Sequence, residues 1–410
     1  MDYHARVDLL EPVVQHYAWG SRTAIADLEG RPVPTDQPEA ELWMGAHPSA
    51  PSRLDRNGAR TTLDAVIAAN PVRELGAECA GRFGGRLPFL LKVLAAEKAL
   101  SIQVHPSREQ AVAGFRAENE RGLALGDKAR NYVDDWPKPE ILCALTPFEV
   151  LAGMRSTADA ATLVRALAVA ELEPVAADLA TADGPQALTA ALARILTWPA
   201  AGRTALIDAV TAACARLAAG DGPYAAACAA TVRIAAEHPG DPGVVASLLL
   251  RHAVLAPGQA VFLPAGGLHT YLHGTGIELL ANSDNVVRAG LTGKHIDVPE
   301  LLKLTDPAVA VPVIAPRPLG NGVTVYDSPA PEFRLYRAVA GAGAGAADVE
   351  VALPADGPRL VLCTEGAVSL RDAAGATIEV ARGESCFLSA ADGAVTARGR
   401  GTLYAAATGS

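Results

Sequence analysis

Cysteine is scarce in this 410-residue chain, and no apolar run is long. The six cysteines form no Cys-x-x-Cys pair, which excludes a disulfide scaffold and a thiolate zinc site and makes buried free thiols the simplest interpretation. The apolar run at residues 244–250 is much shorter than the roughly 18 residues of a membrane-spanning helix. Residues 1–8 lack the apolar core of a signal peptide. We therefore expect a soluble, cytoplasmic protein without a membrane partner.

Basic residues are fewer than acidic ones: 35 lysines and arginines against 45 aspartates and glutamates give a formal net charge of −10. This balance argues against a sequence-independent nucleic-acid binder, because such a protein needs a basic surface to neutralise phosphates. It does not exclude a small anionic substrate, since a few local cations can dominate the field at one site. Half of the residues are apolar, which indicates a globular chain, and the length favours two or three domains.

Residues 156–240 differ in composition from the sequence on either side. Alanine, the strongest helix former, makes up 30 of these 85 residues. Apolar residues recur there at helical spacing in two stripes, formed by Leu188, Leu192, Ile195 and Leu196 and by Leu206, Val210, Ala213 and Leu217. Pro-Gly and Gly-Pro turns divide the region into four or so helices. We predict a helical module with a purely structural role.

The flanking segments are typical of short strands and turns. Before the helical region the candidate strands are 88–94 and 101–105, and after it they are 259–264 and 276–280. Residues 312–320 contain three prolines and a glycine, a linker-like composition. The tail then holds six short candidate strands, as in a sandwich or barrel, at 333–339, 349–353, 360–363, 367–370, 385–388 and 402–405.

One spacing of glycine, proline and histidine resembles the second metal-binding motif of cupins, which are small jelly-roll barrels. Gly258 is followed after five residues by Pro264 and after four more by His269. The tail keeps this spacing without the proline or the histidine, at Gly383, Ser389 and Ala394. We expect the tail to be a second jelly roll that lacks metal ligands.

Polar side chains interrupt three apolar segments. Gln103 and His105 alternate along one predicted strand and therefore point to one face, where either a hydrogen-bonded pair or a divalent metal would satisfy them. Lys138 and Glu140 also share a face of an extended segment, as a surface ion pair or as the wall of a site. Glu278 lies inside an apolar strand, where a carboxylate is rare unless it is paired or functional.

Together these segments resemble the type I mannose-6-phosphate isomerases. The matching motifs follow the family's order from about residue 17 to 300: Tyr-Ala-Trp-Gly at 17–20, Ala-Glu-Leu-Trp-Met-Gly-Ala-His-Pro at 40–48, Gln-Val-His-Pro at 103–106, Lys-Pro-Glu at 138–140, Pro-x4-His at 264–269 and Asp-Asn-Val-Val-Arg-Ala-Gly at 284–290. The resemblance implies a mainly β protein with a cupin-type jelly-roll catalytic domain at 1–155 and 241–315, an all-helical insertion at 156–240, and a second jelly-roll-like domain at 316–410.

The resemblance also implies a zinc enzyme whose four metal ligands fall on Gln103, His105, Glu140 and His269. Two imidazoles, one carboxylate and one amide oxygen suit zinc with positions left for water or substrate, although two histidines and a carboxylate also suit Fe(II). The implied reaction interconverts mannose 6-phosphate and fructose 6-phosphate: a proton moves between C1 and C2 through a cis-enediol. The implied partner is thus a phosphosugar, and we expect a monomer or weak homo-oligomer.

By resemblance the catalytic residues are Lys138, Glu278, Asp284 and Arg288, and the substrate or phosphate contacts are Ser101, Lys92, Lys294, Trp19, Glu41 and Tyr271. Two candidates for the proton carrier stay open. Burial can raise the pKa of Glu278 toward neutrality, and a nearby cation can lower the pKa of Lys138. We expect structural roles for five further histidines, His16, His47, His252, His273 and His295.

The sequence departs from the family's pattern directly before Lys138. The family often has Asn-His there, with the histidine linked to ring opening, whereas this chain has Trp136 and Pro137. Proline cannot transfer protons, so ring opening must use water, Lys138, Asp284, or open-chain sugar already in solution. A metal-holding cupin that binds sugar without catalysis is the alternative function, and an iron-dependent cupin oxygenase is a third.

Overall fold

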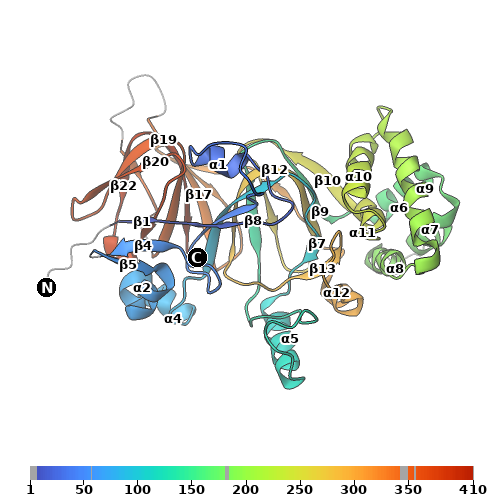
Figure 1. Cartoon of the computed structure of the whole chain (residues 1–410), viewed down its shortest axis with the longest axis horizontal. Coiled ribbons are helices and arrows are strands. Elements are labelled where there is room, and N and C mark those ends of the chain that lie inside the picture. Colours follow the sequence, from blue (N-terminus) through green and yellow to red (C-terminus); the bar gives the residue numbers. More distant parts are fainter. Residues whose placement is uncertain (1–6, 57, 181–183, 342–349, 355–356, 410) are drawn as a thin grey trace.

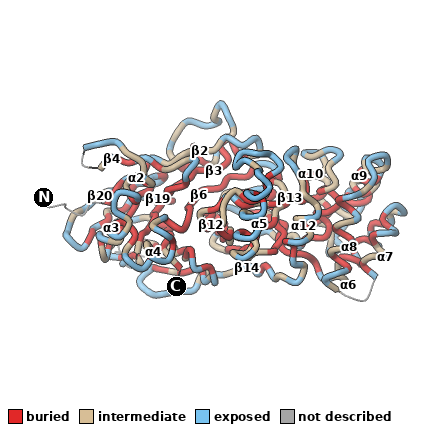
Figure 2. The backbone as a smooth tube through the Cα atoms, turned by 90° about the horizontal axis from the view of Figure 1, so that it is seen from below, coloured by how far each residue is buried: buried red, intermediate tan, exposed pale blue. Residues whose placement is uncertain are grey.

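The computed structural model describes residues 7–56, 58–180, 184–341, 350–354 and 357–409. The molecule is elongated and mainly β, as predicted, with strands of the tail at one end, a β-sandwich in the middle and helices at the other end (Figure 1). The long strands β6 (Phe89–Ala96), β12 (His269–Ala281) and β19 (Arg359–Arg371) are mostly buried (Figure 2). Within the described residues, no helix has the length and apolar character needed to cross a membrane.

Two sheets make up the central sandwich. The larger has the strand order β14 (Val313–Ile314), β11 (Ala260–Leu263), β8 (Glu140–Ala144), β12 (His269–Ala281), β6 (Phe89–Ala96), β3 (Glu41–Met44) and β2 (Val13–Gln15). The smaller comprises β10 (Leu250–Leu255), β9 (Phe148–Met154), β7 (Ile102–Val104) and β13 (Val287–Gly290) together with the beginning of β12. The predicted strands at 88–94, 101–105, 259–264 and 276–280 all fall in these sheets.

Strand β12 belongs to both sheets. Residues 269–273 pair with β9, and His269 also pairs with Gln103 of β7, whereas residues 274–281 pair with β6 and, in part, with β8. The strand crosses between the sheets at Gly274, whose φ is +127°. A Cβ there would lie 2.8 Å from the Pro147 carbonyl oxygen, so the crossing requires glycine. One continuous strand therefore carries residues of both sheets into the space between them.

The helices of residues 157–237 are α6 (Thr157–Leu167), α7 (Glu173–Ala180), α8 (Gly184–Leu196), α9 (Ala200–Ala218) and α10 (Ala225–Glu237). Both predicted apolar stripes face their core, and only Leu217 is partly exposed. The same core includes Ile102 and Val104 of β7 and Val287 of β13. The helices therefore pack directly against the smaller sheet of the sandwich.

Shorter elements complete the fold: α1 (Ala24–Leu28), β4 (Arg53–Arg56), β5 (Ala59–Thr62), α2 (Leu63–Ala69), α3 (Pro71–Leu75), α4 (Ala77–Arg82), α5 (Arg108–Glu120), α11 (Gly243–Ala246) and α12 (Val298–Leu304). The pair β4 and β5 forms a small separate sheet. Ser107 begins α5 with a capping box, in which its hydroxyl accepts from the Gln110 N–H and the Gln110 side chain accepts from the Ser107 N–H.

The tail forms a third sheet with the order β1 (Asp8–Leu10), β21 (Ser385–Leu388), β19 (Arg359–Arg371), β22 (Thr396–Ala407), β17 (Arg334–Ala340), β16 (Val323–Tyr326) and β15 (Arg317–Gly320). Strands β18 (Val351–Ala352) and β20 (Thr377–Ala381) pair with β22 and β19. The candidate strands 360–363 and 367–370 are two parts of β19. Strand β1 joins this sheet from near the N-terminus, although residues 8–10 are assigned to the catalytic domain in the predicted division. Residues 1–6 of that domain lie outside the described part, and the division stays a prediction.

The predicted linker at 312–320 is wrong, because β14 and β15 lie in this segment. Both strands are at the edge of their sheets. Proline lacks an N–H and is tolerated in an edge strand, where that position needs no partner. Pro318 lies within β15, and every residue of that strand is exposed. Proline-rich composition alone therefore does not distinguish an edge strand from a linker.

A single apolar core joins the sandwich to the tail sheet. Phe89 and Ile141 of the sandwich pack in the same cluster as Phe333, Leu360 and Phe387 of the tail, and all five are fully buried. We expect Phe333→Ala to lower the free energy of unfolding by about 3–5 kcal/mol, because it leaves a cavity in this core.

Urea unfolding followed by circular dichroism measures the effect of Phe333→Ala. Leu319→Ala, at a half-exposed position of β15, is the matched control and should change stability by no more than about 0.5 kcal/mol. Equal effects of the two substitutions would contradict a shared core.

Candidate active site

Three buried side chains converge between the sheets of the sandwich. His105 directly follows β7, Glu140 begins β8 and His269 begins β12. Their potential ligand atoms all lie within 4.8 Å of one another. Glu140 Oε1 is 3.3 Å from His105 Nε2, and Glu140 Oε2 is 3.4 Å from His269 Nε2. The pairing of β12 with β7 and β8 thus brings together three of the four predicted metal ligands.

Backbone carbonyls orient both imidazoles toward Glu140. His105 Nδ1 donates to the Asn285 carbonyl oxygen at 2.8 Å, and His269 Nδ1 donates to the Gly267 carbonyl oxygen at 3.0 Å. Each Nε2 of a neutral ring then presents a lone pair to the carboxylate. Burial lowers the pKa of His105 to about 4, so this ring is neutral near pH 7.

This arrangement fits a divalent cation. In the described part of the chain, the buried Nε2 of His105 has no hydrogen-bond partner. Lone pairs on nitrogen and oxygen that face each other at 3.3 Å repel unless a positive charge lies between them. Burial by itself would raise the pKa of Glu140, but the neighbouring Lys138 ammonium helps to hold it well below its usual range, so the carboxylate is ionised. Two imidazole nitrogens and one carboxylate are donors that zinc prefers.

Gln103 lies beside this group. Its backbone is in register with His269 of β12 on one side and with Arg288 of β13 on the other. Its side chain lines the same cavity as Glu140 and His269. Gln103 as a fourth ligand stays a prediction that this placement permits.

A second buried cluster lies deeper on β3, β6 and β12. Lys92 Nζ is 3.1 Å from Glu278 Oε2 and 3.4 Å from Glu41 Oε2. Trp43 Nε1 donates to Glu41 Oε2 at 2.6 Å. Burial by itself would lower the pKa of Lys92, but the flanking carboxylates raise it, so the ammonium stays charged. The predicted phosphate contact Lys92 is therefore already paired with two acidic side chains.

Burial also changes the acid–base chemistry of Glu278 and Tyr271. It raises the pKa of Glu278 to about 7, which confirms the expected direction, while Lys92 opposes the rise. Burial and the neighbouring Glu278 carboxylate raise the pKa of Tyr271, so its phenol stays protonated. Lys138 Nζ lies 3.4 Å from Glu140 Oε1, as its predicted shared face with Glu140 requires.

These groups line a cavity of about 800 Å³, which adjoins a small inner cavity of about 50 Å³. The two share Glu41, Lys92, Leu100, Gln103 and Lys138, and the inner one adds Glu140, His269, Tyr271 and Glu278. The outer part is lined by a stacked Tyr17–Trp19 pair and by polar or cationic side chains of Ser101, Lys98, Thr292, Arg288 and Lys294. The two cavities therefore gather all of the predicted site residues except His105, which contacts Glu140 at the inner one.

Arg288 and Lys294 supply positive charge to the outer part. Burial lowers the pKa of both groups, and Arg288 further lowers that of Lys294 by repulsion. An anion placed beside them would relieve this repulsion and compensate for lost hydration. The outer part is thus suited to a phosphate group.

Asp284 and His47 form a hydrogen-bonded pair at the cavity wall. His47 Nδ1 accepts from the Ser49 N–H at 3.2 Å, so Nε2 carries the hydrogen and contacts Asp284 Oδ2 at 3.2 Å. Burial would raise the pKa of Asp284, but His47 and nearby lysines lower it, so the carboxylate is ionised. His47, expected to be structural, therefore contacts a predicted catalytic residue.

Packing accounts for Trp136, which stands where the family often has asparagine, while Pro137 stands at the histidine position. Trp136 is buried in the core shared with the tail, its ring centroid 5.9 Å from that of Phe83, and Arg86 and Arg108 stack on it. The side chain therefore does not line the cavity, and its position supplies no acid or base there.

Two cavity residues, Glu237 and His238, were not predicted, because residues 156–240 were expected to be purely structural. Both lie at the end of α10 and line the outer part. The sequence contains one weak indication of a role for this segment. His238 is the one histidine between residues 156 and 240, and it lies directly before a Pro-Gly turn.

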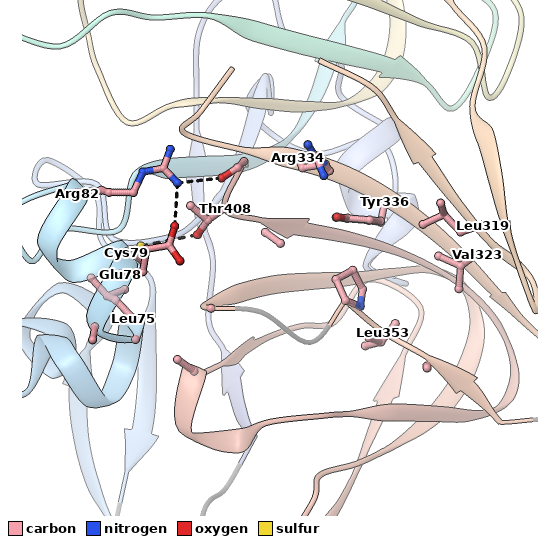
Figure 3. Close-up of a pocket in the computed structure, with 18 of the residues that line it drawn as sticks. Leu75, Glu78, Cys79, Arg82, Leu319, Val323, Arg334, Tyr336, Leu353 and Thr408 are labelled. Carbon is pink, nitrogen blue, oxygen red and sulfur yellow. Dashed lines mark hydrogen bonds and ion pairs between the residues drawn. The ribbon is translucent and has the colours of Figure 1, made fainter. Parts of the chain in front are cut away.

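A second cavity of similar size, about 820 Å³, lies between α4 and the tail sheet (Figure 3). Arg82 of α4 is on one side, where it pairs with Glu78 and donates to the Gly409 carbonyl oxygen, and Arg334 and Tyr336 of β17 are on the other. Among the described residues that line it, none is a predicted site residue. The chemistry therefore belongs to the sandwich cavity.

Comparisons with known proteins identify one family. A family model described as phosphomannose isomerase type I, catalytic domain, matches residues 8–157. The mannose-6-phosphate isomerase of Salmonella typhimurium is 37% identical over 395 residues, with 95% of this chain and 96% of that one covered. The Bos taurus protein of the same name is 33% identical over 412 residues, with 94% of each covered.

Solved structures agree over nearly the whole length. A crystal structure of zinc-bound mannose 6-phosphate isomerase matches with a TM-score of 0.86 at 34% identity, covering 98% of this chain and 100% of that one. A mutant of the phosphomannose isomerase from Salmonella typhimurium matches with a TM-score of 0.88 at 33% identity, covering 98% and 99%.

Proposed function

The chain belongs to the type I phosphomannose isomerase family, and on this premise we propose that its sandwich cavity interconverts mannose 6-phosphate and fructose 6-phosphate. The observation that carries the proposal is that one cavity contains three kinds of functional group. It holds a metal-binding group at Glu140, a buried carboxylate of raised pKa at Glu278, and a cationic outer part at Arg288. Each of the three suits one task of an aldose–ketose isomerisation of a phosphosugar: stabilising the enediolate, moving the proton and binding the phosphate.

Zinc is the cofactor that the family and the donor set support. His105, Glu140 and His269 would hold it, with Gln103 as the proposed fourth ligand. When bound, zinc supplies positive charge that favours the negative oxygens of an enediolate. Lys138, whose ammonium lies beside Glu140, can donate a hydrogen bond to the same oxygens.

Glu278 is the proton carrier that the surroundings favour. A carboxylate with a pKa of about 7 is partly ionised at neutral pH, so it can take a proton from one carbon and return it to the next. Lys92 holds it in place at 3.1 Å. The phenol of Tyr271, protonated because of its raised pKa, can donate a hydrogen bond to the sugar in the same inner cavity.

Asp284 is suited to assist ring opening as a base. Its lowered pKa keeps it ionised, so it can accept the proton of the anomeric hydroxyl, and it cannot act as the acid near neutral pH. The hydrogen bond from His47 holds the carboxylate in position. The proton for the ring oxygen then comes from water or from Lys138.

The phosphate end of the substrate is proposed to lie at Ser101, Arg288 and Lys294, with Trp19 and Glu41 shaping the pocket. We also propose a cytoplasmic location and a monomeric or weakly associated state. The six cysteines are buried and free, as in proteins of a reducing compartment. The acidic net charge continues to argue against nucleic acid as a partner.

A coupled spectrophotometric assay tests the function. We expect zinc-loaded protein to form fructose 6-phosphate from mannose 6-phosphate without dioxygen, a chelator to abolish turnover, and added zinc to restore it. His105→Ala should lose zinc and activity, whereas His252→Ala, which removes a contact with Glu149 outside the cavity, should keep both. No turnover at full zinc occupancy would favour the sugar-binding cupin, and a requirement for dioxygen would favour the oxygenase.

Exchange of the C2 hydrogen with solvent identifies the proton carrier. We expect Glu278→Gln to abolish the loss of deuterium from C2-deuterated mannose 6-phosphate while zinc content stays at one per chain. Lys138→Met should slow turnover and still permit exchange, because it removes a hydrogen-bond donor only. Mass spectrometry of recovered substrate measures both. If Lys138→Met loses the exchange of the C2 hydrogen and Glu278→Gln keeps it, Lys138 is the proton carrier.

The pH dependence of kcat/KM gives a separate test. The active form of Glu278 is ionised, so activity should fall as the pH drops through about 7. Lys92 lowers the pKa of Glu278, so Lys92→Met should move this acid limb to higher pH. Ionisation of the substrate phosphate is the same for both enzymes and cancels in the comparison. An acid limb at the same pH in both would exclude Glu278 as the titrating group.

A further inference from the structure

The end of helix α10 and the residues after it contact two segments that line the cavity. Residues 237–241 leave α10 and lead into α11, and within them Glu237 and His238 line the outer part of the cavity. Residues 237–240 belong to the region that the sequence indicates to be purely structural, and Asp241 is the first residue after it. The contacts of this segment reach the residues just before β7 and just after β13, next to the proposed phosphate-binding side chains.

The first contact holds the loop before β7. The Ala99 N–H donates to Glu237 Oε2 at 2.8 Å, and His238 Nε2 is 3.2 Å from the Ala99 carbonyl oxygen. Both backbone groups of Ala99 are thus bound by adjacent side chains of the helical region. Ser101 follows two residues later, and Gln103 follows on the strand.

The second contact holds the loop after β13. The Thr292 N–H donates to Asp241 Oδ2 at 3.0 Å, while Asp241 Oδ1 accepts from the Gly243 N–H at 2.7 Å. The Thr292 hydroxyl in turn accepts from the Lys294 N–H at 3.1 Å. The hydrogen bonds therefore run from the helical region to the backbone of Lys294.

Close backbone packing supports the second contact. Gly290 has a φ of +150°, and a Cβ built on it would lie 2.6 Å from Gly243 Cα. A side chain at either glycine would separate the two backbones. The end of β13, the strand that carries Arg288, is therefore in direct contact with the start of α11, and Lys294 follows in the loop after it.

We propose that residues 237–241 are a positioning element that fixes the separation between Ser101, just before β7, and the pair formed by Arg288 on β13 and Lys294 in the loop after it, and so sets the affinity for the substrate's phosphate. The inference rests on the proposed function, because it assigns these three side chains to a phosphate. The segment acts on the binding of the anion and leaves the proton-transfer groups of the inner cavity in place. It therefore changes KM and spares kcat.

The test compares Glu237→Ala with Glu237→Gln. Alanine removes the acceptor for the Ala99 N–H, whereas the glutamine side-chain oxygen still accepts it. We expect Glu237→Ala to raise KM for mannose 6-phosphate and the inhibition constant for inorganic phosphate by about tenfold each, with kcat within twofold and one zinc per chain. Glu237→Gln should keep both constants at or below the wild-type values. Steady-state kinetics and elemental analysis give these quantities.

Asp178→Ala is the control for a general effect on the helices, because it removes an ion pair with Arg194 between α7 and α8. It should leave KM and the phosphate inhibition constant unchanged. Two results would overturn the positioning role. One is an unchanged KM and phosphate inhibition constant in the double variant Glu237→Ala/His238→Ala. The other is a fall in kcat that follows the Tm of the variants while KM does not change. If wild-type protein shows no turnover, the proposed function fails, and calorimetric titration of inorganic phosphate into wild type and Glu237→Ala still decides the inference.

Discussion

The repulsion between Glu140 and two imidazole lone pairs is the constraint on which the site depends. Carbonyl oxygens of Asn285 and Gly267 fix the tautomers, so neither ring can turn a hydrogen toward the carboxylate. A cation is the simplest group that makes this arrangement favourable. The surrounding strands are therefore built to be stable with metal, and the same backbone contacts that orient the ligands also define the walls of the cavity.

The charge balance of the interior explains the chemistry of the remaining groups. Three buried carboxylates, Glu41, Glu140 and Glu278, face two ammonium groups, Lys92 and Lys138. Lys92 is shared between two of these carboxylates and cannot neutralise both. Burial therefore raises the pKa of Glu278 to about 7, because Lys92 opposes the rise only in part. This combination of burial and shared counter-charge, which is common in active sites, suits Glu278 to the general-base role proposed for it.

Much of the site was predictable because alternation along a strand fixes the face of a side chain. Gln103 and His105, Lys138 and Glu140, and Glu278 within an apolar run all followed from local pattern, and the family motifs supplied the partners. Contacts between distant segments were not predictable. His47 meets Asp284 across more than two hundred residues, and Glu237 binds the backbone of Ala99, yet neither local sequence shows such a partner. The edge strand β15 was mistaken for a linker because strand pairing, which makes its proline acceptable, is also a long-range property.

The pairing of β1 with β21 has a consequence for how the chain reaches this fold. Leu10 is opposite Ser385, so β1 must wait during synthesis until more than 370 further residues have been made before its partner exists. Until then its backbone hydrogen-bonding groups are open to other strands. Such a long-range pairing closes late and slowly. The tail sheet is thus completed late, and until then the backbone of β1 is open to wrong pairing.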